Sequence, residues 1–90
     1  MSTVKFPAVL RANVGGAREV EAAGTTIGEV LDSLVAAYPA LRDQLFTADG
    51  ELNRFVNVYL NGQDVRYLAG PDTPVTTADE VRLLPAMAGG

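Results

Sequence analysis

Residues 25–38 read Thr25-Thr26-Ile27-Gly28-Glu29-Val30-Leu31-Asp32-Ser33-Leu34-Val35-Ala36-Ala37-Tyr38 and carry the most regular pattern in the chain. Apolar side chains recur there with the helical period of about 3.6 residues. Thr26 and Glu29 have the spacing of a capping box, and Pro39 is expected to end the helix. The stretch predicts one amphipathic helix with an apolar face to be buried. That face consists of Ile27, Val30, Leu31, Leu34, Val35 and Tyr38.

A β-hairpin is predicted before this helix. Residues Val4–Leu10 are rich in Val, Phe and Leu and are interpreted as a first strand. Asn13–Gly16 has the composition of a turn, and Arg18–Glu21 follows as a second strand. The Gly15-Gly16 pair could also cradle a phosphate, but the strand, glycine loop and helix that such a site needs do not follow one another here.

Further strands are predicted after the helix. Ala40–Phe46 is expected to be a short apolar turn or helix, and Arg54–Leu60 alternates as a strand. Asn61-Gly62 is a strong hairpin signal, with Gln63–Arg66 as the return strand. Asp79–Leu84 is the last predicted strand. The order predicts an α+β roll in which four to five strands pack on one main helix.

Composition limits the chemistry that this chain can perform. The 90 residues suit one small domain, and the absence of Cys and His removes thiolate nucleophiles, disulfides and the usual base near neutral pH. We expect no metal site, since zinc would need an all-carboxylate ligand set. Glu29 and Asp32 could be offered as a catalytic pair, but a helix start and a solvated helix face explain them. We therefore expect no catalytic residue.

Charge and hydropathy limit the partners. A net charge of −4 with scattered arginines argues against nucleic acid, and instead suits a partner with a basic docking surface. No apolar run is long enough to span a membrane, and residues 1–7 do not resemble a signal peptide. The expected location is the cytoplasm, with no membrane partner.

The sequence ends in Leu84-Pro85-Ala86-Met87-Ala88-Gly89-Gly90. Two glycines add little to a core, but they make a thin segment that can pass through a narrow channel. Residues 86–90 reach roughly 17 Å when extended at about 3.3–3.6 Å per residue. The alternative is an idle, frayed end. We expect a domain over residues 1–85 and a flexible tail over residues 86–90, in which Met87 suits a partner's groove.

These features together resemble the β-grasp, ubiquitin-like sulfur-carrier proteins of the MoaD/ThiS-like family. The resemblance covers essentially the whole chain. The ending Asp79–Gly90 is similar to that of the small subunit of molybdopterin synthase. Arg54–Asn61, followed by Asp64-Val65-Arg66, looks closer to the branch of carriers that serve cysteine biosynthesis (CysO-like).

The resemblance implies a carrier protein and not an enzyme. It implies that a partner adenylates the Gly90 carboxylate with ATP, and that a sulfur donor then converts Gly90 to a thiocarboxylate. Other implied partners are a pyridoxal-phosphate (PLP)-dependent cysteine synthase, which takes the sulfur, and a JAMM-type metallopeptidase, which releases the cysteine. The carrier itself would bind no cofactor. The implied threading residues are Ala86, Met87, Ala88 and Gly89.

A docking patch is predicted from strand alternation. Phe55, Tyr59 and Leu84 are expected on the outer face of the sheet, together with the polar residues Lys5, Asn57 and Arg82. The alternative is that Phe55 and Tyr59 serve cross-strand packing. Three rival functions also stay open, namely the molybdopterin synthase small subunit, a ubiquitin-like protein modifier, and a plain interaction module.

Overall fold

The computed structural model describes residues 1–85, and the expected tail, residues 86–90, lies outside the described residues. Within residues 1–85, five strands form one mixed sheet in the order β2-β1-β5-β3-β4. The strands are β1 Ser2–Lys5, β2 Glu19–Ala22, β3 Val56–Leu60, β4 Gln63–Asp64 and β5 Glu80–Pro85. The helices are α1 Ala8–Arg11, α2 Ile27–Ala37 and α3 Arg42–Leu45, with short 3-10 helices at Ala12–Val14, Pro39–Leu41, Val65–Tyr67 and Gly70–Asp72.

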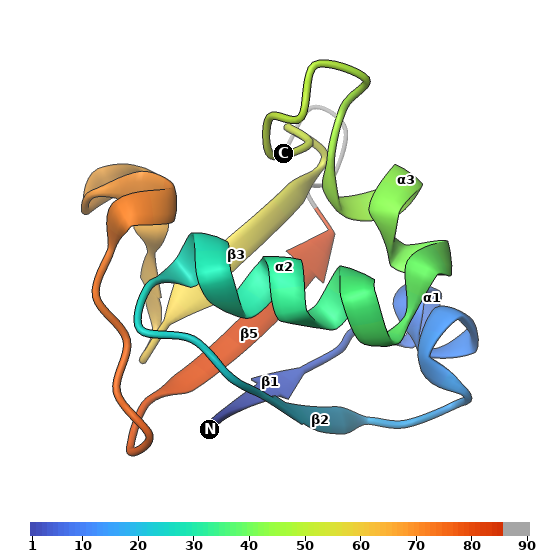
Figure 1. Cartoon of the computed structure of the whole chain (residues 1–90), viewed down its shortest axis with the longest axis horizontal. Coiled ribbons are helices and arrows are strands. Elements are labelled where there is room, and N and C mark those ends of the chain that lie inside the picture. Colours follow the sequence, from blue (N-terminus) through green and yellow to red (C-terminus); the bar gives the residue numbers. More distant parts are fainter. Residues whose placement is uncertain (86–90) are drawn as a thin grey trace.

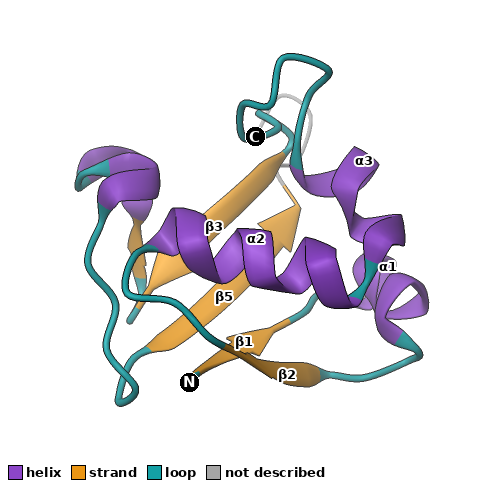
Figure 2. Cartoon of the chain, in the orientation of Figure 1, coloured by secondary structure: helices purple, strands orange, loops and turns teal. Residues whose placement is uncertain are grey.

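The last strand along the chain lies in the middle of the sheet. β5 pairs in parallel with β1 and antiparallel with β3, while β2 and β4 form the two edges. Figure 1 shows β1 and β5 running side by side although they come from opposite ends of the described chain. Figure 2 shows α2 lying across one face of these strands. This is the predicted α+β, β-grasp architecture, and the prediction is confirmed.

The main helix agrees closely with its sequence pattern. The five apolar side chains from Ile27 to Val35 are buried, and Tyr38 packs half-buried against them. Thr26 caps the helix by accepting a hydrogen bond from the Glu29 N–H at 3.2 Å. The Glu29 carboxylate accepts from the N–H of Thr25 at 2.8 Å, one residue further back than a standard capping box. This bond, and a second one from the Thr25 hydroxyl at 2.9 Å, hold the pKa of Glu29 below its usual value.

The core lies between α2 and the sheet. Each strand alternates, so that Val4, Val58, Val81 and Leu83 point toward α2 and are fully buried. Leu41 and Leu45 are fully buried in this core, and the expected short helical segment at Ala40–Phe46 is present as Pro39–Leu41 and α3. The core therefore draws on residues from both ends of the described chain, from Val4 to Leu83.

The first strand is shorter than predicted. β1 stops at Lys5 rather than at Leu10, and Ala8–Arg11 forms the short helix α1. Phe6 makes the last link to the neighbouring strand, donating its N–H to the Arg18 carbonyl at 2.9 Å. Pro7 has no N–H to donate, so the ladder ends there and Pro7 starts a helix instead.

The second hairpin also differs from the prediction in its return strand. Asn61 and Gly62 have φ values of 50° and 89°, which suits the expected tight turn. However, β4 covers only Gln63–Asp64, because the Asp64 carboxylate accepts from the Arg66 N–H at 2.9 Å and turns the chain into a 3-10 helix. β3 likewise starts at Val56 rather than Arg54.

Candidate functional site

The sheet face turned away from α2 is the candidate docking surface, called here the outer face. The residues between the buried ones along each strand point to it. In β5 these are Glu80, Arg82 and Leu84, and in β3 they are Asn57 and Tyr59. Lys5 joins them from β1, since it lies opposite Arg82. The expectation that Lys5, Asn57 and Arg82 share this face is therefore met.

The structure brings two of the three predicted docking residues together. In the β3–β5 register Asn57 lies opposite Leu84 and Tyr59 lies opposite Arg82, so Tyr59 and Leu84 are diagonal neighbours. Both line a hollow of about 400 Å³, together with Asn61, Gly62, Glu80 and Arg82. Tyr59 and Leu84 are each half-buried. A half-buried aromatic beside an apolar residue can pack against a partner's side chain.

Phe55 lies apart from this hollow. It precedes β3 rather than belonging to it, and its N–H is held by the Asn53 side-chain oxygen at 2.9 Å. Its side chain is 64% exposed, so cross-strand packing does not account for it. Phe55 is therefore an exposed aromatic residue just before β3, and not a member of the Tyr59–Leu84 pair.

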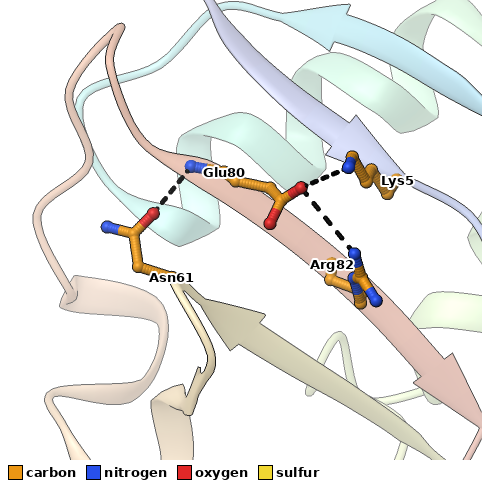
Figure 3. Close-up of polar contacts among 4 residues, drawn as sticks. All are labelled: Lys5, Asn61, Glu80 and Arg82. Carbon is orange, nitrogen blue, oxygen red and sulfur yellow. Dashed lines mark hydrogen bonds and ion pairs between the residues drawn. The ribbon is translucent and has the colours of Figure 1, made fainter.

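A charged network ties the outer face to the strands that build it (Figure 3). The Glu80 carboxylate lies 2.6 Å from the Lys5 Nζ and 3.8 Å from an Arg82 guanidinium nitrogen. The hydrogen bond from Lys5, more than the charge of Arg82, holds the pKa of Glu80 below its usual value. The Glu80 N–H donates to the Asn61 side-chain oxygen at 2.9 Å, which fixes the β3–β4 turn against β5. One carboxylate thus serves two cations from two strands.

A second polar cluster lies at the free edge of β3 and was missed from the sequence. The Arg66 guanidinium donates to the Asn57 side chain at 2.7 Å and to the carbonyls of Val56 and Arg54 at 2.9 and 3.2 Å. β4 pairs only with Tyr59 and Leu60, so Arg66 satisfies carbonyls that a longer strand would have covered. Sequence alternation gives no sign of such a cap.

The remaining predicted site residues cannot be placed. Gly90 and the threading residues Ala86, Met87, Ala88 and Gly89 lie outside the described residues. The chain enters that segment directly from β5, whose last residue is Pro85. Within residues 1–85, no three carboxylates gather closely enough to hold a metal ion. None of the helices in this part of the chain has the length and apolar character needed to cross a bilayer.

Comparison with known proteins agrees with this geometry. The ThiS family model matches residues 4–90. The chain is 42% identical over 90 residues to the sulfur carrier protein CysO of Mycobacterium tuberculosis, covering 98% of this chain and 97% of that protein. It is 38% identical over 82 residues to small archaeal modifier protein 1 of Haloferax volcanii, covering 88% of this chain and 90% of the relative.

A solved structure supports the same relationship. The crystal structure of the Amycolatopsis orientalis BexX/CysO complex contains a chain that is 38% identical, with a TM-score of 0.90 and full coverage of both chains. These relatives are small carrier or modifier proteins, consistent with a chain that is not itself an enzyme. Sequence and fold thus lead to one conclusion, that this chain belongs to the ThiS family of ubiquitin-like, β-grasp sulfur-carrier proteins.

Proposed function

We propose that this protein carries sulfur as a thiocarboxylate on its C-terminal residue, Gly90, and delivers it for cysteine biosynthesis. The observation that carries the proposal is the 42% identity to the sulfur carrier protein CysO over 98% of the chain. The composition supports it, because a carrier with neither Cys nor His has no other strong nucleophile to compete with the terminal group.

The chemistry begins with activation of a poor electrophile. A terminal carboxyl has a pKa of about 3.3–3.7, so it is ionised at neutral pH and resists nucleophilic attack. In the proposed step a carboxylate oxygen of Gly90 attacks the α-phosphorus of ATP and pyrophosphate leaves. A sulfur nucleophile from a donor then attacks the acyl carbon, and AMP leaves with the oxygen. The adenylating enzyme supplies the ATP site, and the carrier supplies only its tail.

The second transfer uses the sulfur as a nucleophile. The Gly90 thiocarboxylate adds to an aminoacrylate in a PLP-dependent cysteine synthase. Once the amino group is released from the cofactor, the glycyl acyl group moves to it from sulfur, which frees the thiol and leaves cysteine joined to Gly90 by a peptide bond. A JAMM-type metallopeptidase hydrolyses that bond and restores the carboxylate. Each cycle consumes ATP, which is available in the cytoplasm, and we therefore propose that the protein acts there.

The described residues suit transient docking beside the tail. Tyr59 and Leu84 offer a small apolar contact on the outer face, and Leu84 is separated from Ala86 by Pro85 alone. Phe55 adds an exposed ring at the start of β3. We propose that these three residues dock while Ala86, Met87, Ala88 and Gly89 enter the partner's active site. The thin segment needs no space for large side chains beyond Met87.

Intact mass of the protein purified from its source cell tests the proposal. We expect a population in which one oxygen has been replaced by sulfur, and tandem mass spectrometry should place that change on Gly90. A reaction with the adenylating enzyme, ATP and a sulfur donor should raise this population, and omission of ATP should abolish it. An unmodified carboxyl under all of these conditions would overturn the proposal.

The same measurement separates a protein modifier from a sulfur carrier, whereas a molybdopterin synthase small subunit would carry the same thiocarboxylate and is distinguished by its interface. A protein modifier uses the same activation, and the relative named small archaeal modifier protein 1 gives that alternative its support. Its sign would be Gly90 joined to lysines of other proteins. A molybdopterin synthase small subunit needs a permanent and extensive apolar interface. The charged residues Lys5, Glu80 and Arg82 on the outer face argue against one.

A further inference from the structure

A group of basic side chains surrounds a hollow beside the C-terminal half of β5. The hollow has a volume of about 480 Å³, and its basic residues, called here the basic cradle, are Lys5, Arg11, Arg18 and Arg82. Leu83 and Leu84 of β5 also line this hollow, so the cradle lies beside the end of β5, close to the last described residue, Pro85.

The topology gathers these four residues from separate parts of the sequence. Lys5 ends β1 and lies opposite Arg82 of β5 in the parallel pair. Arg18 comes just before β2, where its carbonyl accepts the N–H of Phe6 at 2.9 Å. Arg11 ends α1 and reaches back, donating its side-chain Nε–H to the Phe6 carbonyl at 3.2 Å. Arg11 is thus fixed by a neutral partner and keeps its charge available.

The local charge is opposite to the charge of the whole chain. The chain has a net charge of −4, yet four of its seven basic residues and only one of its eleven acidic residues, Glu19, line this hollow. Glu80 lies nearby and is shared between Lys5 at 2.6 Å and Arg82 at 3.8 Å. Within residues 1–85, neither Arg11 nor Arg18 has a carboxylate within ion-pair distance. The cradle therefore keeps an excess of positive charge.

We propose that the basic cradle docks on an acidic segment of the adenylating enzyme, with Arg18 and Arg82 contacting its carboxylates. This inference rests on the proposed function and specifies the partner's chemistry. An enzyme that receives residues 86–90 must approach the end of β5, so the cradle would lie against it. Guanidinium groups suit carboxylates because they can bind both oxygens at once. The net charge alone would predict a basic partner surface, and the cradle predicts an acidic one at this point.

The experiment compares charge reversals that alter the net charge equally. Arg18→Glu and Arg82→Glu change the cradle. Arg42→Glu is the matched control, since Arg42 is an exposed residue of α3 that lies beside Asp32 and Ala36 of α2, on the other side of the sheet. Adenylation by the enzyme purified from the source cell is followed as pyrophosphate release over a range of carrier concentrations. Circular dichroism melting confirms that each variant folds.

We expect each cradle reversal to lower kcat/KM by about 10-fold or more, mainly through KM, because like charges facing each other across an interface are costly. Arg42→Glu should stay within about twofold of the wild type. The wild-type kcat/KM should fall with added salt, and the Arg18→Glu variant should lose most of that dependence. Equal effects of all three reversals, or a salt-independent wild type, would overturn the inference.

The proposed function can be judged separately in the same samples. At saturating carrier, the cradle variants should still form the thiocarboxylate, because Gly90 is unchanged. If even the wild type forms no thiocarboxylate, the proposed carrier function is wrong. If the variants form it with a wild-type KM, only the proposed docking of the basic cradle is wrong. A gel-shift assay with a short RNA covers the other polyanion. Salt-sensitive RNA binding that Arg18→Glu abolishes would assign the cradle to nucleic acid and overturn the proposal.

Discussion

At the scale of single residues, Asp79 links two loops through its carboxylate. One oxygen accepts from the Asn61 side-chain amide at 2.9 Å and the other accepts from the Thr76 N–H at 2.8 Å. The bond from Asn61 is the larger cause, and together they hold the pKa of Asp79 below its usual value. A carboxyl with a lowered folded-state pKa stabilises the fold above the unfolded-state pKa. That contribution is lost as pH falls through the folded-state value.

We therefore expect the stability difference between the wild type and Asp79→Asn to depend on pH. The difference should be full above the unfolded-state pKa of about 3.9 and should shrink as the pH falls below it. Urea unfolding at a series of pH values from about 6 to about 3 measures it. The subtraction removes other carboxyls, including Glu29 and Glu80. A difference that is constant or grows on acidification would contradict the assigned role of Asp79.

Tyr59 tests the docking face at the same scale. We expect Tyr59→Ala to lower kcat/KM for adenylation by about tenfold, because truncated aromatic anchors commonly cost more than 1 kcal/mol of binding. Expressed as free energies, the loss of fold stability should be smaller than the loss in kcat/KM, and the melting temperature measures the former. Tyr67→Ala is the matched control, since Tyr67 is a tyrosine with 88% exposure outside the sheet. Wild-type rates for Tyr59→Ala at sub-saturating concentrations of the carrier would remove Tyr59 from the docking face.

At the scale of elements, α2 provides the test of the core. Leu34 is 1% exposed and lies at the centre of the buried helix face. Leu34→Ala should lower the free energy of unfolding by about 2–5 kcal/mol through the cavity that it leaves. Asp32→Ala, on the exposed face of the same helix, should change it by no more than about 0.5 kcal/mol. Chemical denaturation measures both, and similar losses in the two variants would mean that the helix is rotated.

The free edge of β3 supplies a second test at this scale. Arg66→Met removes the donors to the carbonyls of Val56 and Arg54. It should lower the free energy of unfolding by about 1 kcal/mol, the typical net contribution of a hydrogen bond. Arg42→Met, at an exposed position in α3, is the control. Hydrogen exchange should also speed up in β3. Unchanged exchange and stability would show that Arg66 does not protect this edge.

The sequence predicted best what depends on local periodicity. The α2 face, its Thr26 cap and the alternation of β3 all follow from residues close to one another in the chain, and the structure confirms them. The predicted strand ends were wrong where a single residue ends the pairing between strands. Pro7 does so after β1, and Asp64 does so as the last residue of β4. An apolar composition alone cannot reveal those interruptions.

The candidate site was predicted only in part for a related reason. Alternation predicted that Tyr59 and Leu84 lie on one face. The register between β3 and β5 makes them diagonal neighbours, which alternation alone does not predict. The basic cradle was not foreseen, because Arg11 and Arg18 meet Arg82 only through the parallel pairing of β1 with β5. A parallel pair leaves no turn signature between its strands.

At the scale of the whole molecule, the domain and the tail are predicted to be separable. Among residues 1–85, the last buried core residue is Leu83, near the end of β5. Deletion of Gly90, or addition of residues after it, should abolish adenylation while the melting temperature stays unchanged. Calorimetry and pyrophosphate release measure the two effects. A drop of several degrees would mean that the tail is structural.

A reaction of the intact protein can also distinguish the cysteine-biosynthesis carrier from the molybdopterin synthase small subunit. Thiocarboxylate protein mixed with a PLP-dependent cysteine synthase and an activated serine should give a cysteine adduct on Gly90, detected by mass spectrometry. The charged outer face favours such transient docking over a permanent complex. A large subunit that stays bound through gel filtration, with no adduct from any cysteine synthase tested, would decide for molybdopterin synthesis.

The central position of β5 has a consequence for how the protein is made in the cell. β5 is the last of the five strands to leave the ribosome, yet it joins β1 to β3. Until Pro85 has emerged, the β1–β2 and β3–β4 pairs have no strand between them, and β1 and β3 each lack one of their two neighbours. Translation that stops before β5 is complete thus leaves a chain that cannot form the described sheet and has no Gly90. Within residues 1–85, the sheet can therefore be completed only when nearly the whole chain has been made, shortly before Gly90 is added.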